Sequence, residues 1–172
     1  HNKSSLELLA LHVQGKHKNV QITRECVIAS DLHTPPEVLS QLAKSIDKNV
    51  RSRVAGNTST PTDAFLHLAK PNGDPVLGII AGNPSAPSEL LLRLAQDPDR
   101  DVRLNVASNP SSPPNTLRHL AKDSDKYVRQ AVARNVSLPV DVVDELVSDV
   151  DEDVRFYIAE NPASPMEILS AR

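Results

Sequence analysis

Arginines recur along this chain at a spacing that could place guanidinium groups in a row. Each follows a valine, and the four are Arg51, Arg103, Arg129 and Arg155. Because arginine can hold a phosphate through two parallel N–H groups, such a row predicts phosphate or nucleic-acid binding. Aspartates recur beside the row at the same period, at Asp99, Asp101, Asp125, Asp151 and Asp153. We favour a structural interpretation, in which each arginine pairs with an aspartate of its own or a neighbouring turn; such pairing would argue against the phosphate site.

The other residues capable of chemistry do not form a recognisable reactive set. Asp149, Asp151 and Asp153 alternate as in a calcium loop, but Val154 stands where that loop needs a glycine for its sharp turn. Cys26 is the only cysteine, and the six histidines show no metal-ligand spacing, which argues against a disulfide framework and a cysteine-ligated cluster. We therefore expect no catalytic residue, no metal and no cofactor, and we interpret the protein as non-catalytic.

The positions of these residues follow a repeat of 26 residues. Alanine, asparagine and proline recur in fixed columns, represented in the fourth repeat by Ala107, Asn109 and Pro113. The asparagine column comprises Asn57, Asn83, Asn109, Asn135 and Asn161. Self-similarity at a fixed period indicates a repeat architecture. Because asparagine can both donate and accept hydrogen bonds, we expect its column to satisfy backbone groups at the turn between segments.

Each repeat is predicted to contain two helices. The first starts at the proline column, has apolar residues at helical spacing, as in Leu117, Leu120 and Ala121, and is expected to be the longer. Its start has the pattern of a capping box, with a hydroxyl side chain before the proline at Thr34, Thr60, Ser112 and Ser164. The second helix runs through the valine–arginine pair and ends at Asn-Pro. In two units that pair is replaced, by Arg24-Glu25 and by Val76-Leu77, and we expect local distortion of the stack there.

Stacking of these units predicts one all-α repeat domain over residues 1–172. We expect residues 1–19 to form an N-terminal capping helix and a linker, and residues 20–172 to form about six repeats, the last of them truncated. Neither helix is long enough to be stable alone, so each repeat must bury its apolar side chains against its neighbours. Since a solenoid normally ends in a polar cap and the sixth unit stops partway through its first helix, we expect a fragment of a longer protein.

The phrase Asp101–Pro113, with apolar residues at helical spacing after it, resembles the variant leucine-rich repeat. Asp153–Pro165 matches the same pattern, and the resemblance covers about residues 24–170. It implies a right-handed superhelical solenoid of alternating long α-helices and short α or 3₁₀ helices, in place of the strands of ordinary leucine-rich repeats. Some relatives carry an iron–sulfur module, a function that the single cysteine of this chain does not support.

Composition and charge narrow the range of partners. Aromatic residues make up only 2% of the chain, so the core must be built from leucine, valine, isoleucine and alanine. The net charge is −3, and residues 87–172 carry 15 acidic against 10 basic residues, whereas nucleic-acid-binding proteins usually have a basic excess. No apolar run is long enough to cross a membrane and no signal-peptide pattern is present, so we expect a cytoplasmic protein without a membrane partner.

Two adjacent columns on the valine–arginine helix vary while the rest of the repeat stays constant. A solenoid places its binding surface at such columns, and the partner-binding candidates there are Arg53, Leu104, Asn105, Gln130, Phe156 and Tyr157. Exposed aromatic side chains make good anchors for a partner, so Phe156 and Tyr157 are the leading pair unless they pack on a following repeat. The sequence therefore predicts a scaffold that binds a protein or peptide, with nucleic-acid or phosphate binding along the arginine row as the alternative.

Overall fold

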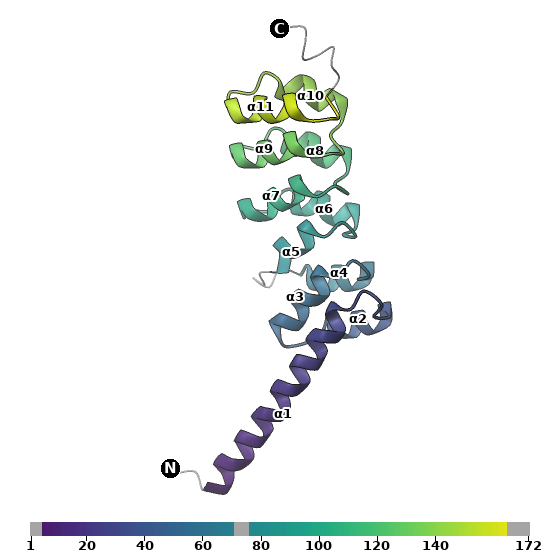
Figure 1. Ribbon diagram of the computed structural model, residues 1–172, viewed down its shortest axis with the longest axis vertical. Helices are drawn as coiled ribbons and strands as arrows, with labels where there is room; N and C mark the ends of the chain where they lie inside the picture. The colour runs from purple at the N-terminus through teal and green to yellow at the C-terminus, as the bar shows by residue number, and fades with distance from the viewer. Residues whose placement is uncertain (1–4, 71–75, 165–172) are drawn as a thin grey trace. The chain divides into compact units, whose positions relative to one another are not determined.

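The computed structural model describes residues 5–70 and 76–164, with side chains from residue 17 onward. Within these ranges all regular secondary structure is α-helical and comprises eleven helices (Figure 1). The chain forms two compact units, His1–Leu68 and Ala69–Arg172, which are described separately. The all-α repeat architecture expected from the 26-residue period is confirmed within each unit.

The first unit begins with a long helix. α1 (Ser5–Ser30) is followed by α2 (Pro36–Leu42), α3 (Lys48–Gly56) and α4 (Thr62–Leu68). α1 packs against α3, and α2 packs against α4. α1 continues without interruption through residue 19, where we expected a linker between a capping helix and the first repeat.

The second unit contains seven described helices. They are α5 (Val76–Gly82), α6 (Ser88–Leu94), α7 (Arg100–Ser108), α8 (Pro114–Leu120), α9 (Lys126–Arg134), α10 (Val140–Leu146) and α11 (Glu152–Glu160). α5, α7, α9 and α11 stack on one another in one row, and α6, α8 and α10 form a second row beside it (Figure 1). The helix expected after Pro165 lies outside the described residues.

The relative lengths of the two helices in a repeat are the reverse of our expectation. α6, α8 and α10, which follow the proline column, have seven residues, whereas α7, α9 and α11 have nine. Each seven-residue helix of the second row ends in a turn such as the one in which Asp97 N donates to Leu94 O, three residues earlier, at 3.1 Å. This turn leads the chain into an acidic loop, from which an aspartate starts the next helix.

The prediction of a capping box, in which the hydroxyl side chain before the proline caps the following helix, is also wrong. The N-cap of α8 is Pro113, which forms no side-chain capping bond. The buried Ser112 hydroxyl instead donates to Val106 O, in the last turn of α7, at 2.6 Å. The nine-residue helices are the ones that side chains cap: Asp99 Oδ1 accepts from Asp101 N at 2.8 Å at the start of α7. Asp47, Asp125 and Asp151 do the same for α3, α9 and α11.

The core consists of small and branched aliphatic side chains, as the composition predicts. Leucines of the seven-residue helices and valines and alanines of the nine-residue helices are buried between the two rows. Fully buried examples in the second unit are Ile80, Leu91, Val106, Leu117, Val132 and Leu146. Phe65, in the first unit, is the one aromatic ring in the core of the described residues.

Within the second unit, a ladder of buried asparagines joins successive repeats. Asn109 Nδ2 donates to the backbone oxygens of Ala81 and Asn83, both at 2.8 Å, and its Oδ1 accepts from Ser111 N at 2.9 Å. Asn135 and Asn161 repeat this arrangement one and two units further along. The prediction that the asparagine column satisfies backbone groups at the turn is confirmed, and the satisfied groups belong to two repeats.

Replacing a ladder asparagine should destabilise the second unit. Asn135→Ala removes bonds to Ala107 O and Asn109 O and from Ser137 N, all at buried or part-buried sites. Because an unsatisfied buried polar group costs about 1–3 kcal/mol, we expect the free energy of unfolding in urea to fall by about 3 kcal/mol. Asn115→Ala, at an exposed position on α8, should change it by less than about 0.5 kcal/mol. Equal effects of the two substitutions would contradict the ladder's role.

Candidate binding surface

Two members of the arginine row form bidentate ion pairs between repeats. Arg103 donates from Nε to Asp123 Oδ2 at 2.7 Å and from Nη2 to Asp123 Oδ1 at 3.2 Å. Arg129 makes the same pair with Asp149, at 2.8 and 3.0 Å. Both carboxylates are 8% exposed. The remaining nitrogen, Nη1, donates to backbone oxygens of the preceding acidic loop, so all three nitrogens of each guanidinium have protein partners.

The other two arginines of the row also bind backbone carbonyls. Arg51 Nη1 donates to Ser45 O and Ile46 O, at 2.8 and 3.0 Å. Arg155 Nη1 donates to Asp149 O at 2.7 Å. Every arginine of the row therefore clamps the loop that precedes its own helix, which is the behaviour expected of structural arginines.

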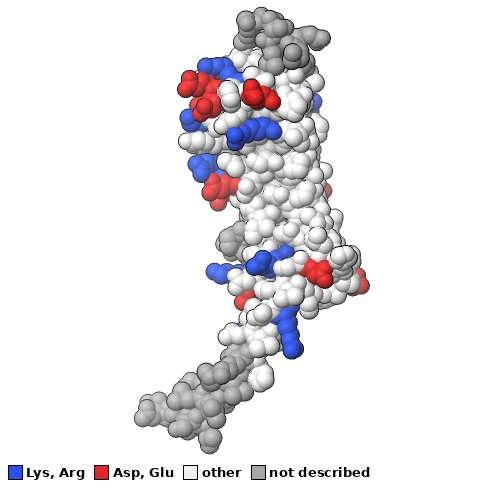
Figure 2. Space-filling model, in the orientation of Figure 1, with Lys and Arg blue, Asp and Glu red and all other residues white. Residues whose placement is uncertain are grey.

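Surface charge in the second unit is mixed. Acidic and basic side chains alternate along the edge formed by α7, α9 and α11, and no continuous basic stripe is visible on the face shown (Figure 2). A phosphate backbone is bound by clustered lysine and arginine side chains that are free to displace its counterions. This arrangement does not favour the nucleic-acid alternative.

The ion pairs lower the pKa of the aspartates that receive them. Burial alone would raise the pKa of the Asp149 carboxyl, but hydrogen bonds from Arg129 and from the backbone N–H of Asp151 outweigh burial and hold that pKa below its usual value. Asp123 is held low in the same way by Arg103. Hydrogen bonds from Gln130 and Lys126 lower the pKa of Asp151 to about 2.

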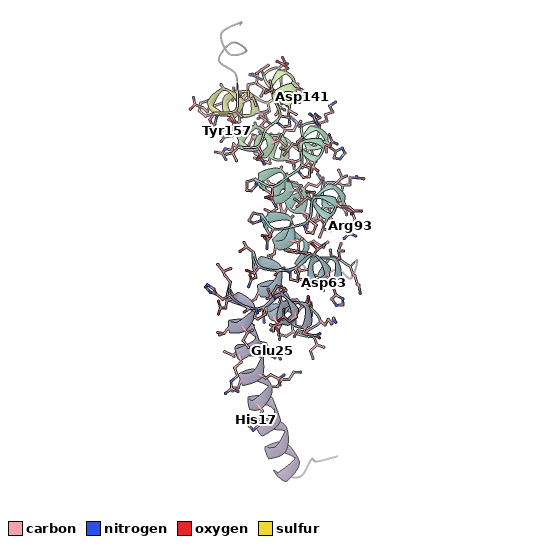
Figure 3. All side chains as sticks on the ribbon, turned by 90° about the vertical axis from the view of Figure 1, so that its right-hand side faces the viewer. His17, Glu25, Asp63, Arg93, Asp141 and Tyr157 are labelled. Atoms are coloured by element: carbon pink, nitrogen blue, oxygen red, sulfur yellow. The ribbon has the colours of Figure 1, made fainter. Side chains whose placement is uncertain are left out.

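Residues of α7 and α9 line a groove. A cavity of about 260 Å³ lies between α7 and α9, and its lining includes Leu104, Tyr127, Ala131 and Arg134. Tyr127 is 50% exposed. We call the surface made by Leu104, Tyr127, Ala131, Arg134, Phe156 and Tyr157 the aromatic face. Figure 3 places Tyr157 on the opposite side of the second unit from Arg93 of α6 and Asp141 of α10.

Contacts across α9 and α11 fix the aromatic side chains. The Arg134 guanidinium carbon lies 3.8 Å from the centre of the Tyr157 ring, a cation–π contact between adjacent repeats. Phe156 and Tyr157 meet edge to face with ring centres 5.6 Å apart. Phe156, on the last described helix, is 59% exposed within the described residues.

The remaining partner-binding candidates, Arg53, Asn105 and Gln130, lie in different environments. Asn105 is half-buried and donates to Gly78 O at 3.1 Å, and Gln130 is buried and donates to Asp151 Oδ1 at 3.0 Å. Both side chains therefore serve contacts between repeats. Arg53 is exposed and lines a separate cavity in the first unit, together with Cys26. Tyr127, which the sequence analysis did not select, lies beside the groove.

Residues 76–99 and 100–125 match the family model for the leucine rich repeat variant. Over these two segments the chain is similar to leucine-rich repeat variant proteins. A solved structure described as "a leucine-rich repeat variant with a novel repetitive protein structural motif" is 29% identical to this chain, with a TM-score of 0.60. The match covers 84% of this chain and 57% of that one, so this chain spans less than two thirds of the length of its relative. No curated protein matches.

The described part of the chain offers no alternative site of metal chemistry. Within residues 5–70 and 76–164, no three histidine, cysteine, aspartate or glutamate side chains are grouped so that they could hold a metal ion. None of the helices described there is long and apolar enough to cross a membrane.

The Arg129–Asp149 pair should make stability depend on pH in the acid range. Because folding lowers the pKa of Asp149, its stabilising contribution is complete above the unfolded value of about 3.9 and is lost as the pH falls through the lower folded value. We therefore expect Asp149→Asn to be less stable than the unmodified chain at pH 7, and this difference to shrink below about pH 4. Urea unfolding of both proteins between pH 7 and pH 2 measures this difference in the free energy of unfolding.

A carboxylate without this contact provides the control. Asp144 lies exposed on α10, and Asp144→Asn should follow the unmodified chain in parallel across the pH range. A difference between the unmodified chain and Asp149→Asn that is as large at pH 2 as at pH 7 would show that the ion pair is not the cause.

Proposed function

We propose that this chain is a non-catalytic helical-repeat scaffold that binds a protein or peptide segment on its aromatic face. The observation that carries the proposal is the exposure of Tyr127 at the groove between α7 and α9, with a second exposed ring, Phe156, on the adjacent α11. Both residues lie on the nine-residue helices, whose outer positions differ between otherwise constant repeats. Variable side chains on a constant frame are how solenoid proteins acquire binding specificity.

The physical properties of the aromatic face suit a peptide ligand. Aromatic side chains bury a large area at low cost in conformational entropy, and they are enriched among the residues that dominate binding energy. Tyr127 is further oriented by the charged ends of Lys126 and Arg100, which lie 5.4 and 5.8 Å from its ring centre. Because Arg134 also holds Tyr157 in place, little ordering of these rings is needed when a ligand binds.

The groove gives a ligand a place to insert side chains next to Tyr127. Leu104 and Ala131 form its apolar part, and the polar end of Arg134 lies at the same cavity. An apolar floor with a few convergent polar groups is the usual make-up of a site that recognises a short segment. The neighbouring buried Gln130 is fixed by its bonds to the next repeat, which keeps the wall of the groove rigid.

Substitution of the two exposed rings should weaken this binding. Peptides selected from a displayed library on the unmodified chain should bind Tyr127→Ser/Phe156→Ser at least about tenfold more weakly, since anchor residues contribute about 2 kcal/mol or more. Fluorescence anisotropy with labelled peptides measures the affinities. The matched control is Leu92→Ser/Val140→Ser, which removes two exposed apolar side chains from α6 and α10 and should leave the affinities unchanged.

Two outcomes would contradict the proposal. One is that the selected peptides bind the double variant and the unmodified chain equally well. The other is binding of an oligonucleotide that both double variants retain and that moderate salt abolishes, which would assign the function to the arginine row.

A further inference from the structure

The Arg–Asp pairs of the second unit define a repeated binding position for a guanidinium group. In each pair a carboxylate of one acidic loop receives an arginine from the nine-residue helix of the repeat before it. Asp123 receives Arg103, and Asp149 receives Arg129. The backbone oxygen of each aspartate also accepts a hydrogen bond from a second arginine, which belongs to the same repeat as the aspartate. This arginine is Arg129 for Asp123 and Arg155 for Asp149. Each of these aspartates therefore joins two arginines.

Asp97 is the corresponding residue one repeat earlier, 26 residues before Asp123, and it holds only one arginine. Its backbone oxygen accepts from Arg103 Nη1 at 2.9 Å, as in the other repeats. In the later repeats the carboxylate is reached by an arginine of the preceding repeat. The corresponding residue for Asp97, 26 positions before Arg103, is Leu77. Among the described residues, no lysine, arginine or histidine forms an ion pair with the Asp97 carboxylate.

The Asp97 carboxylate nevertheless has the orientation of its paired counterparts. Asp97 Oδ1 accepts from the backbone N–H of Asp99 at 2.9 Å. The equivalent bonds, from Asp125 N to Asp123 and from Asp151 N to Asp149, are also 2.9 Å long. The loop thus sets the carboxylate in the geometry that binds arginine in two later repeats, without the arginine.

A cavity lies where the missing guanidinium would be. It has a volume of about 380 Å³, and its lining includes Asp97, Leu77, Leu94, Pro98 and Arg93. Leu77 and Leu94 offer an apolar surface to the methylene groups of a long side chain, and Asp97 offers a carboxylate to its charged end. The guanidinium of Arg93 is turned toward the backbone, where Nη2 donates to Ala69 O at 2.8 Å.

We propose that this cavity, the Asp97 cavity, binds an arginine side chain supplied by a peptide or protein partner. The incoming guanidinium takes the place at Asp97 that Arg103 takes at Asp123, with two parallel N–H groups on one carboxylate. Arginine is favoured over lysine because an ammonium group cannot form this bidentate contact. The Asp97 cavity is separate from the aromatic face, so its role does not depend on the function proposed above.

The probe for a test is Nα-acetyl-L-arginine amide, titrated into the complete chain labelled with ¹⁵N. We expect saturable shifts of the Asp97 and Asp99 amide signals, with a dissociation constant on the order of millimolar, which is typical of one side chain. The neutral analogue Nα-acetyl-L-citrulline amide should bind at least tenfold more weakly, and the lysine analogue should also bind more weakly. Equal shifts with arginine and citrulline would overturn the proposal.

Two substitutions test the site from opposite directions. Asp97→Asn removes the charge and should abolish the shifts. Leu77→Arg restores the arginine of the repeat pattern, so it should fill the position from within, abolish arginine binding and raise the melting temperature. Retention of binding by both variants would overturn the proposal. Tyr127→Ser/Phe156→Ser should bind the arginine probe normally, which separates failure of this proposal from failure of the aromatic face.

Discussion

The structure of the second unit depends on how the last carbonyl groups of helices such as α7 and α9 are satisfied. A helix that ends in the interior leaves backbone oxygens without an intrahelical partner, and such groups must find donors elsewhere. Here the donor is the amide of an asparagine one repeat later: Asn135 Nδ2 reaches Ala107 O and Asn109 O. Asn135 is 4% exposed, so water is not an equivalent substitute. Backbone oxygens at the end of one repeat thereby receive their hydrogen-bond donor from the next repeat.

Asparagine suits this position because it combines two functions in a short side chain. Its NH₂ group donates to two carbonyls of the preceding repeat, while its oxygen accepts the backbone N–H two residues later, as Ser137 N does for Asn135. Aspartate has no donor, and glutamine would need more room. The ladder therefore fixes both the spacing of repeats and the turn in which each asparagine lies. With this frame in place, the outer columns of α7, α9 and α11 can vary without loss of the fold.

The sequence predicted the features that follow from periodicity and missed those that depend on contacts between repeats. The 26-residue period, the aliphatic core and the role of the asparagines are visible in single columns. The capping role of Ser112 was wrong because its hydroxyl finds a carbonyl of the preceding helix within reach. Asp123 and Asp149 were not among the aspartates proposed as arginine partners, because each partner lies 20 residues after its arginine, at a distance that only stacking makes short. Gln130 belongs to a variable column, yet it is buried and donates to Asp151 and Asp153 of the next repeat.

The most direct test of this account is the hydrogen exchange of asparagine side-chain amides, followed by NMR in the complete chain. If the ladder holds the repeats together, the Nδ2 protons of Asn109, Asn135 and Asn161 can exchange only when neighbouring repeats separate. We expect them to exchange as slowly as the backbone amides of the buried residues Val106 and Val132, and far more slowly than the side-chain amide of the exposed Asn115. Exchange of the ladder protons at the rate of Asn115 would contradict the central role of the ladder.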